Sequence, residues 1–456
     1  MDENLSAELA EVLGDRFTTS EHERQQHGKD ESSLKPMPPD AVCFPISTAE
    51  VARIVRLCHQ HHTPLIPFGA GSSLEGHIFA PQGGVSVDLS RMNQILRVSA
   101  DDLDCTVQAG VTRQQLDKHL RPQGLFFPVD PGADATLGGM TSTRASGTNA
   151  VRYGTMSDNV LMLTVVLPDG EIIKTGTRAR KSAAGYDLTH LFVGAEGTLG
   201  IITEVTLRVQ GVPEAIAAAV VGFSDFESAV QAVTQVRQIS VPVARIEFLD
   251  EVMVQAVNKF AGLSLVEQPT LFLEFHGSNA SVKENAELVG EIMRDLGGSD
   301  FKWAVNQEER TNLWTARHNA YYAGLAFRPG CRALTTDVCV PISRLAECIV
   351  ETKRDLEDSS LVAPIVGHVG DGNFHLMMLV DPNQPKEYAE AQRINERLVQ
   401  RALAMDGTIT GEHGVGLGKK KYMNSEHGAE ALAVMRAIKR ALDPENLMNP
   451  GKMLPE

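Results

Sequence analysis

Hydrophobic and polar positions along the first half of the chain alternate between the spacing of helices and that of strands. Residues 51–62 carry their apolar side chains on one helical face. Short apolar runs bounded by glycine or proline, which are typical of β-strands, lie at 64–69, 84–90, 103–110, 159–168 and 200–209. The pattern therefore predicts short strands that alternate with short helices and Gly-rich turns from about residue 40 to residue 210.

The pattern changes near Pro213, where a second domain is expected to begin. Between residues 215 and 300 a strand, a helix, two strands and another helix follow one another, as in a ferredoxin-like sheet. A strand pair is expected at about 361–380, and a long polar helix at 386–405. The 456 residues exceed the roughly 250–300 that one core usually reaches. We therefore expect a helical segment, two domains and a closing segment, at residues 1–39, 40–214, 215–424 and 425–456.

Composition and charge narrow the class of protein and its partners. Hydrophobic residues make up 43% of the chain and charged residues 22%, as in an ordinary globular enzyme. The formal net charge of −16 disfavours nucleic acid and anionic lipid as partners. The sequence has no apolar run near the roughly 20 residues of a membrane-spanning helix, no secretory signal and no C-x-x-C pair among its six cysteines. These features predict a cytoplasmic protein, at most peripheral at the inner face of a membrane.

Two Gly-rich stretches follow predicted strands and suggest a nucleotide cofactor. In residues 67–77, glycines and serines allow backbone N–H groups to form a nest for a pyrophosphate. Residues 130–154 hold almost no large apolar side chain, which suits backbone that lines a large flat ligand. The spacing of the first stretch, G-x-G-x-x-x-x-G, matches neither the Rossmann fingerprint nor a Walker A loop. Plain surface loops are the alternative for both stretches.

Two histidines near a turn suggest a metal site. Asp371-Gly372 is a dipeptide that favours a two-residue hairpin turn. In that register His368 pairs directly with His375, and the two imidazoles share one face with Cβ atoms about 5 Å apart. Two histidines that merely cap a hairpin are the alternative. Glu412-His413, in a later Gly-rich stretch, can supply a third ligand and an imidazole base, although a solvated turn has the same pattern.

Three long motifs occur in one order: PFGAGSSLEG, PVDPGADATLGGMTSTRASGTNAVRYG and VGAEGTLGIITEVTLRV. Together they resemble the FAD-binding domain of the vanillyl-alcohol-oxidase/PCMH flavoprotein superfamily. Over about residues 40–456 the chain is similar to its FAD-dependent D-2-hydroxyacid dehydrogenases, the group of D-lactate dehydrogenase (cytochrome), the glycolate oxidase flavin subunit and D-2-hydroxyglutarate dehydrogenase. The resemblance implies an α+β fold: a PCMH-type FAD-binding domain of two α+β subdomains, then a ferredoxin-like antiparallel-sheet substrate or cap domain. Residues 425–456 would return to the FAD domain.

The resemblance also implies which residues bind the cofactor, the metal and the substrate. FAD would be non-covalent, because Gly-Ser-Ser stands where relatives with covalent FAD have a histidine. The implied metal ligands are His368, His375 and Glu412, for which zinc is the best match and manganese or iron the alternatives. His413 would be the base near the flavin N5, and Arg317 would hold the substrate carboxylate. The residues implied for FAD are Gly69, Ala70, Gly71, Ser72, Ser73, Pro131, Thr136, Gly138, Gly139, Thr143, Ser146, Gly147, Glu196, Gly200, Ile202 and Asn449.

On the residues alone Arg317 is a helix-surface arginine, and Arg332 is a weaker second candidate. The expected reaction is metal-assisted oxidation of a D-2-hydroxy acid, with the hydroxyl proton taken by His413 and a hydride passed to flavin. D-Lactate is the expected substrate, with glycolate or D-2-hydroxyglutarate as alternatives. A cytochrome, a quinone or an electron-transfer flavoprotein is expected to accept the electrons, and a homodimer is expected. Competing interpretations are an aryl-alcohol or sugar oxidase, a metallohydrolase and a non-catalytic FAD-binding subunit.

Overall fold

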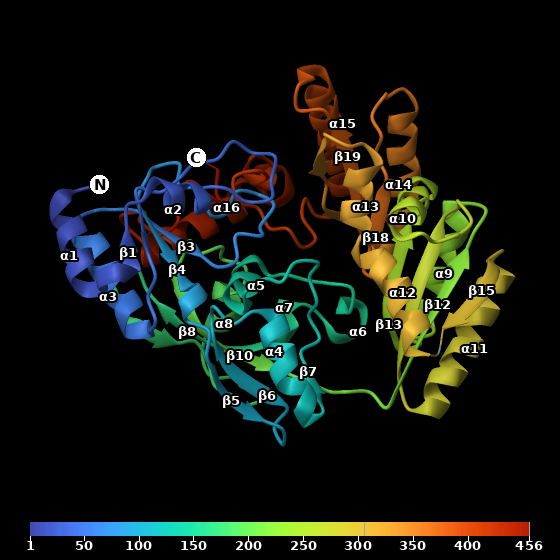
Figure 1. The fold of residues 1–456 in the computed structure, drawn as a ribbon, viewed down its shortest axis with the longest axis horizontal. Helices are drawn as coiled ribbons and strands as arrows, with labels where there is room; N and C mark the ends of the chain where they lie inside the picture. The colour runs from blue at the N-terminus through green and yellow to red at the C-terminus, as the bar shows by residue number, and fades with distance from the viewer. Residues whose placement is uncertain (305, 456) are drawn as a thin grey trace. The chain divides into compact units, whose positions relative to one another are not determined.

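The protein is described by a computed structural model that covers residues 1–304 and 306–455 (Figure 1). Its backbone contacts divide it into two compact units. Unit 1 comprises residues 1–146, 154–212 and 412–456, and unit 2 comprises residues 147–153 and 213–411. The predicted domain ends, at residues 214 and 424, lie beyond these boundaries.

The first sheet of unit 1 has the strand order β1-β2-β4-β3. Its members are β1 (Phe17–Thr18), β2 (Ala41–Cys43), β3 (Leu65–Phe68) and β4 (Val85–Asp88). Helices α1 (Glu3–Leu13) and α3 (Thr48–Gln60) bury their apolar faces in the same core as this sheet. The predicted segment 1–39 is therefore part of unit 1, because Leu5, Leu9 and Leu13 are fully or almost fully buried there.

The second sheet of unit 1 is antiparallel, with the order β5-β6-β10-β8-β9. Its strands are β5 (Ile95–Ser99), β6 (Asp104–Gln108), β8 (Val160–Val166), β9 (Ile172–Lys174) and β10 (Ile201–Arg208), and β7 (Leu125–Phe126) pairs separately with β11 (Gln210–Gly211). The helices of unit 1 not yet named are α2 (Glu21–Gln26), α4 (Arg113–Leu120), α5 (Leu137–Thr143), α7 (Met156–Asn159), α8 (Leu188–Phe192) and α16 (Met423–Leu442). Short 3-10 turns are η1 (Gly14–Arg16), η2 (Leu89–Arg91), η3 (Arg121–Gln123) and η4 (Lys420–Tyr422).

Unit 2 is built on an antiparallel sheet of order β15-β12-β14-β13-β18-β19-β16, with β17 beside β19. The first four strands in that order are the 4-1-3-2 arrangement of a ferredoxin-like fold, as the alternation of elements predicts. The strands are β12 (Ala215–Gly222), β13 (Val243–Leu249), β14 (Thr270–Gly277), β15 (Ser299–Ala304), β16 (Arg332–Thr335), β17 (Val338–Cys339), β18 (Ile365–His368) and β19 (Asn373–Val380).

Helices flank this sheet, and α10, α12 and α13 share a core cluster with it. The helices of unit 2 are α6 (Ala150–Tyr153), α9 (Phe226–Gln238), α10 (Glu251–Ala261), α11 (Asn279–Asp295), α12 (Gln307–His318), α13 (Ala320–Phe327), α14 (Ile342–Glu357) and α15 (Pro385–Ala404). None of the described helices is both long enough and apolar enough to cross a membrane.

The short helix α6 comes from the Gly-rich stretch 130–154 but belongs to unit 2. Arg152 Nη1 donates to the carbonyl oxygens of Pro242 (2.8 Å) and His276 (2.7 Å). The Tyr153 hydroxyl lies 2.8 Å from His276 Nδ1. These partners are about 90 or more residues away in sequence, which is why local patterns did not predict the assignment.

The β18–β19 hairpin corrects a prediction. A two-residue turn would pair His368 with His375, but His368 lies opposite Asn373, and His375 lies opposite Val366. Residues 369–372 form the loop, in which the N–H of Asp371 donates to the carbonyl of His368 (3.0 Å). The neighbouring strand sets this register, because β17 pairs with β19 and a Cβ on Gly372 would lie 2.0 Å from the Val340 carbonyl oxygen.

Asp250 begins α10 with a buried cap. Its Oδ1 accepts the N–H of Met253 at 2.8 Å, and the residue is 2% exposed. Burial raises the pKa of Asp250 to about 7, against the attraction of Lys353 Nζ at 3.9 Å. In the unfolded chain the pKa of an aspartate is about 3.9. Between about pH 4 and pH 7, Asp250 is therefore protonated in the folded state and ionised in the unfolded chain. This carboxyl makes the protein less stable as the pH rises from about 4 to about 7.

Asp250→Asn keeps the capping oxygen and removes the buried charge. We expect the melting temperature of the variant to exceed that of the parent at pH 8, with the difference shrinking toward pH 4. The free energy involved is at most about 1.4 kcal/mol per pH unit. Thermal unfolding across this pH range measures it, with Asp225→Asn as the control, because Asp225 caps α9 in the same way (2.8 Å to the N–H of Ser228) but its pKa is lowered by that bond. An equal difference at all pH values would contradict the prediction.

Candidate active site

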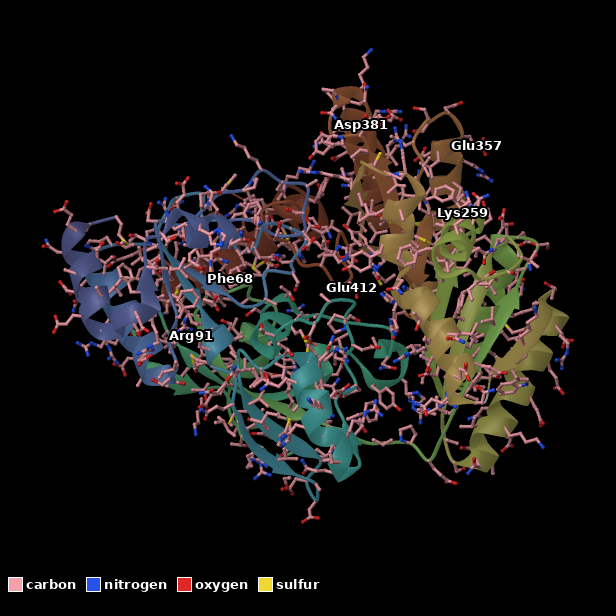
Figure 2. All side chains as sticks on the ribbon, viewed as in Figure 1. Phe68, Arg91, Lys259, Glu357, Asp381 and Glu412 are labelled. Atoms are coloured by element: carbon pink, nitrogen blue, oxygen red, sulfur yellow. The ribbon has the colours of Figure 1, made fainter. Side chains whose placement is uncertain are left out.

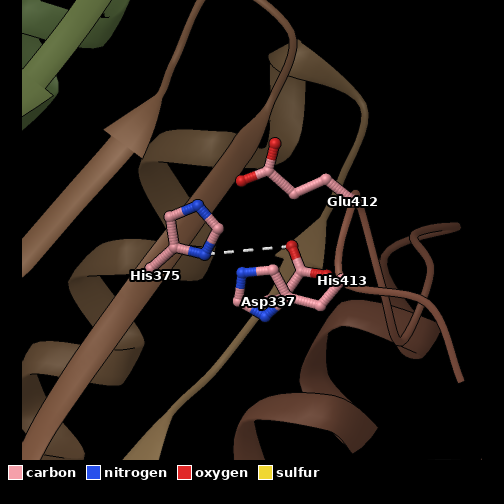
Figure 3. Close-up of side chains that lie close together, drawn as sticks. All are labelled: Asp337, His375, Glu412 and His413. Carbon is pink, nitrogen blue, oxygen red and sulfur yellow. Dashed lines mark ion pairs between the residues drawn. The ribbon is translucent and has the colours of Figure 1, made fainter. Parts of the chain in front are cut away.

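Four side chains that can ligate a metal ion lie close together (Figure 3). Asp337, His375, Glu412 and His413 each offer one atom, and these atoms all lie within 4.8 Å of one another. Asp337 and His375 are buried, and Glu412 and His413 are half-buried. Three of the four were predicted from the sequence to form the metal and acid–base site; Asp337 was not.

The segment that leads to Glu412 is anchored in unit 2. Thr408 exchanges backbone hydrogen bonds with Cys339, at 2.8 and 3.4 Å. The Thr410 hydroxyl donates to Asp337 Oδ2 (2.7 Å), and the N–H of Gly411 donates to the Asp337 carbonyl (3.2 Å). A Cβ on Gly411 would lie 2.3 Å from Asn373 Nδ2, so glycine lets the segment approach β19 closely. Glu412 follows directly from this anchored backbone.

The hydrogen bond at His375 decides which ring nitrogen can ligate. Nδ1 of His375 lies 2.9 Å from the carbonyl oxygen of Thr336. A carbonyl oxygen only accepts, so Nδ1 carries a hydrogen, and in the neutral form of the ring Nε2 carries the lone pair. Asp337 Oδ1 lies on the Nδ1 side, 3.8 Å away, and Asp337 also accepts hydrogen bonds from Asn373 (2.9 Å) and Thr410. Asp337 therefore holds the ring and its surroundings in place, and the ligand atom of His375 is Nε2.

His368 is not part of the four-residue group, but its ring contacts that of His375. The ring centroids are 5.6 Å apart, with the planes at 87°. Nδ1 of His368 lies 2.8 Å from Glu247 Oε1. The carboxylate accepts, so Nδ1 carries a hydrogen, and in the neutral form of this ring the lone pair is on Nε2. A metal-binding histidine characteristically donates its other N–H to a carboxylate or carbonyl in this way.

Glu247 links His368 to Arg317. The Arg317 Nη2 group pairs with Glu247 Oε2, while Oε1 faces His368. Arg317 is 8% exposed, and its Nε has no hydrogen-bond partner in the part of the chain that the structure describes. Burial opposes the charge on Glu247, but His368 and Arg317 outweigh it and lower the pKa of Glu247. Arg317 is thus a buried cation with a donor to spare, not a surface arginine, whereas Arg332 is exposed at the start of β16.

Sequence reasoning missed Glu247, although it left a signal. The acid stands inside the apolar run ARIEFL of β13 and is 1% exposed. A carboxylate is rarely buried so completely without a paired charge.

In unit 1, the two Gly-rich stretches contact each other. The first begins after Phe68, the last residue of β3, which is labelled in Figure 2. A Cβ on Gly69 would lie 2.3 Å from Thr136 Oγ1. Thr136 caps α5 by accepting the N–H of Gly139 (3.3 Å), and the N–H of Gly138 donates to Ala109 at 2.8 Å. The small residues keep these backbones close, as a cradle for a large flat cofactor requires.

Asp30, which sequence reasoning also missed, closes the first stretch. Its Oδ2 accepts the Ser73 hydroxyl (3.1 Å) and the N–H of Gly76 (2.8 Å). The N–H of Glu31 in turn donates to the Ser73 carbonyl at 3.1 Å. Ser73 thus supports the loop through both its hydroxyl and its carbonyl.

Glu196 is predicted to lie along the FAD, and its carboxylate binds backbone N–H groups. Oε1 accepts the N–H of Val415 (2.6 Å), and Oε2 accepts that of Gly416 (2.9 Å). His77 Nε2 lies 3.4 Å from Oε1; burial opposes the imidazolium, but Glu196 outweighs it and raises the pKa of His77. Asn449 joins the same cluster, because its Nδ2 donates to the carbonyls of Glu196 (2.7 Å) and His77 (3.0 Å).

The remaining predicted cofactor residues occupy several environments. Ile202 packs in the core of unit 1, and a Cβ on Gly200 would lie 2.8 Å from the Val166 carbonyl oxygen. The Thr143 hydroxyl donates to Gly139 in its own helix (3.2 Å). Ala70, Gly71 and Ser72 lie in the loop after β3, Pro131 lies in the loop before α5, and Ser146 and Gly147 lie where the chain passes from unit 1 to unit 2.

Comparison with known proteins identifies the cofactor. Residues 39–176 match the family model of the FAD binding domain, and residues 212–453 match that of the FAD linked oxidases, C-terminal domain. “Probable D-lactate dehydrogenase, mitochondrial” of Danio rerio is 55% identical over 99% of this chain and 92% of its own. “D-lactate dehydrogenase (cytochrome), mitochondrial” of Arabidopsis thaliana is 46% identical over 99% of this chain and 80% of its own.

A solved structure has the same fold. The 4-ethylphenol oxidase from Gulosibacter chungangensis, in complex with isoeugenol, matches with a TM-score of 0.81 over 99% of this chain and 97% of its own, at 18% identity. The expected FAD cofactor and PCMH-type α+β fold are confirmed. The expected cytoplasmic location is contradicted, because both relatives are named as mitochondrial proteins.

Gly69→Ala tests the cradle. The added methyl group would displace the Thr136 hydroxyl and the α5 cap, which costs about 1 kcal/mol. We expect FAD to dissociate about fivefold more readily, measured by flavin fluorescence on dilution of the holoenzyme. Gly132→Ala is the matched control, because a Cβ there meets nothing within 4 Å. Equal FAD affinity in the two variants would show that Gly69 does not shape the site.

Proposed function

The chain belongs to the FAD-linked oxidases, and from that premise we propose that it oxidises a D-2-hydroxy acid, D-lactate foremost, to the 2-oxo acid with the help of a divalent metal. The observation that carries the proposal is the buried Arg317, joined through Glu247 to His368, whose ring contacts His375. A 2-hydroxy acid offers one anionic carboxylate and one hydroxyl. A buried arginine suits the first, and a metal suits the second.

The residues present fit both implied groups. The lack of a Cβ at Gly69 lets the two Gly-rich stretches lie against each other, as a cradle for FAD requires, and FAD would supply the hydride acceptor. In this proposal Nε2 of His368, Nε2 of His375 and the Glu412 carboxylate would form a His2Glu donor set, which suits zinc, with manganese or iron as alternatives. The metal, when bound, lowers the pKa of the substrate hydroxyl.

In this proposal each side chain has one task. Arg317 holds the substrate carboxylate and fixes which face of the α-carbon is presented. His413 takes the proton from the substrate hydroxyl as the α-hydrogen leaves with its electron pair for the flavin. His368, His375 and Glu412 hold the metal, and Asp337 keeps its neighbours in place.

The electron acceptor and the assembly state are parts of the same proposal. The name of the Arabidopsis relative includes a cytochrome, and we assign a cytochrome as the acceptor on that likeness. A quinone or an electron-transfer flavoprotein is the alternative. The homodimer stays a prediction.

A substrate and metal assay tests the reaction. We expect D-lactate to bleach the flavin anaerobically and to reduce a dye or cytochrome c, with L-lactate inert and with glycolate and D-2-hydroxyglutarate slower. Thorough chelation should lower kcat/KM by about 100-fold, because Lewis-acid assistance is worth several kcal/mol, and added zinc or manganese should restore it. Turnover of L-acids alone, or activity indifferent to chelation, would overturn the proposal.

Arg317→Lys tests the carboxylate clamp. Lysine keeps the charge but loses the planar fork, so a charge-assisted hydrogen bond worth about 1.5–3 kcal/mol is lost. We expect KM for D-lactate to rise about 10–100-fold. Arg310→Lys is the control on the same helix, where Arg310 donates to the Ile216 carbonyl at 2.9 Å. A KM unchanged in Arg317→Lys would place the carboxylate elsewhere.

A further inference from the structure

Glu247 lies at the centre of a hydrogen-bonded network of three side chains within unit 2. One carboxylate oxygen accepts from His368 Nδ1 at 2.8 Å, and the other pairs with Arg317 Nη2. Glu247 is 1% exposed, Arg317 is 8% exposed, and His368 is half-buried. The three residues come from β13, α12 and β18, so the network depends on the tertiary fold.

A contribution to folding stability alone does not explain this buried network of side chains. Removing a carboxylate and a guanidinium from water costs several kcal/mol per ion, and hydrophobic residues of equal volume often do as well. The two partners of Glu247 are the proposed substrate clamp and a proposed metal ligand. That choice of partners favours a role in the site.

We infer that Glu247 is a positioning residue that couples the two halves of the substrate site. It fixes His368 in the tautomer with the lone pair on Nε2, and it holds the Arg317 guanidinium in one orientation. The inference rests on the proposed function, since it concerns a metal at His368 and a 2-hydroxycarboxylate at Arg317.

The shared carboxylate makes the two binding events cooperative. A cation at Nε2 makes the Nδ1–H of His368 a stronger donor, so Glu247 is drawn toward His368 and its hold on Arg317 weakens. The charge of Arg317 is then more available to a substrate carboxylate. By linkage, a carboxylate bound at Arg317 must strengthen metal binding by the same factor.

Glu247→Gln is the principal test. Glutamine has one acceptor oxygen for two donors, and its NH2 group can donate to Nδ1, which would move the His368 hydrogen to Nε2 and block ligation. We expect Zn²⁺ affinity of the substrate-free holoenzyme, measured by competition with a chromogenic chelator, to fall about 10–100-fold. KM for D-lactate at saturating zinc should rise at least about fivefold.

Glu274→Gln is the matched control. Glu274 is a buried acid on the neighbouring strand β14, 2.7 Å from His276 Nε2 and 3.5 Å from Arg245 Nε. The Glu274→Gln variant therefore loses contacts of a carboxylate with a histidine and an arginine, as Glu247→Gln does, but away from the proposed metal. We expect a lower melting temperature in both variants, but zinc affinity and KM within about twofold of the parent only in Glu274→Gln.

Glu247→Asp keeps two acceptor oxygens and covers the case in which the glutamine variant does not fold. Its zinc affinity is expected to lie between those of the parent and Glu247→Gln. Zinc affinity and KM unchanged in folded Glu247 variants would overturn the inference while leaving the proposed function intact. A parent enzyme that neither binds zinc nor needs a metal would overturn the proposed function itself.

Discussion

The chemistry of unit 2 depends on which nitrogen of each histidine carries the hydrogen. A carbonyl at His375 and a carboxylate at His368 both accept from Nδ1, so in the neutral form of each ring the lone pair is on Nε2. Neither acceptor can donate, so neither ring can reverse its tautomer without losing a buried hydrogen bond. The ring centroids lie 5.6 Å apart, and in the proposed function the two rings would share one ion.

The charges of the site favour the cation that the proposed function requires. Arg317 is already paired with Glu247, so that pair brings no net charge to an incoming acid. Glu412 and the buried Asp337 add negative charge, in a chain whose net charge is −16. An anionic substrate would be repelled by this negative charge, and a bound divalent ion would make the local charge more positive and favour binding. In the proposed function the metal would thus serve substrate binding as well as activation of the hydroxyl.

Most of the fold could be predicted from the chain, because local patterns determine it. The predicted runs at 64–69 and 159–168 contain β3 and β8, and the ferredoxin-like order follows from the alternation after Pro213. The hairpin register was wrong because β17, over 30 residues away, sets it. The role of Arg317 could be predicted only from the family resemblance, because helical spacing does not reveal that the side chain is buried and paired with Glu247. Glu247 and Asp337 were not predicted as site residues, because the side chains they contact are distant in sequence.

The Gly-rich stretch after His413 has a physical cause that its sequence alone does not reveal. Gly414 has a positive φ of 80°, and a Cβ there would lie 2.8 Å from both Glu196 Oε1 and His77 Nε2. A side chain would push away the carboxylate that holds the N–H groups of Val415 and Gly416. Glycine at 414 therefore leaves room for the Glu196 carboxylate to hold the backbone directly after Glu412 and His413. Within unit 1, Glu196 therefore holds the backbone that directly follows the residues proposed for metal binding and proton transfer.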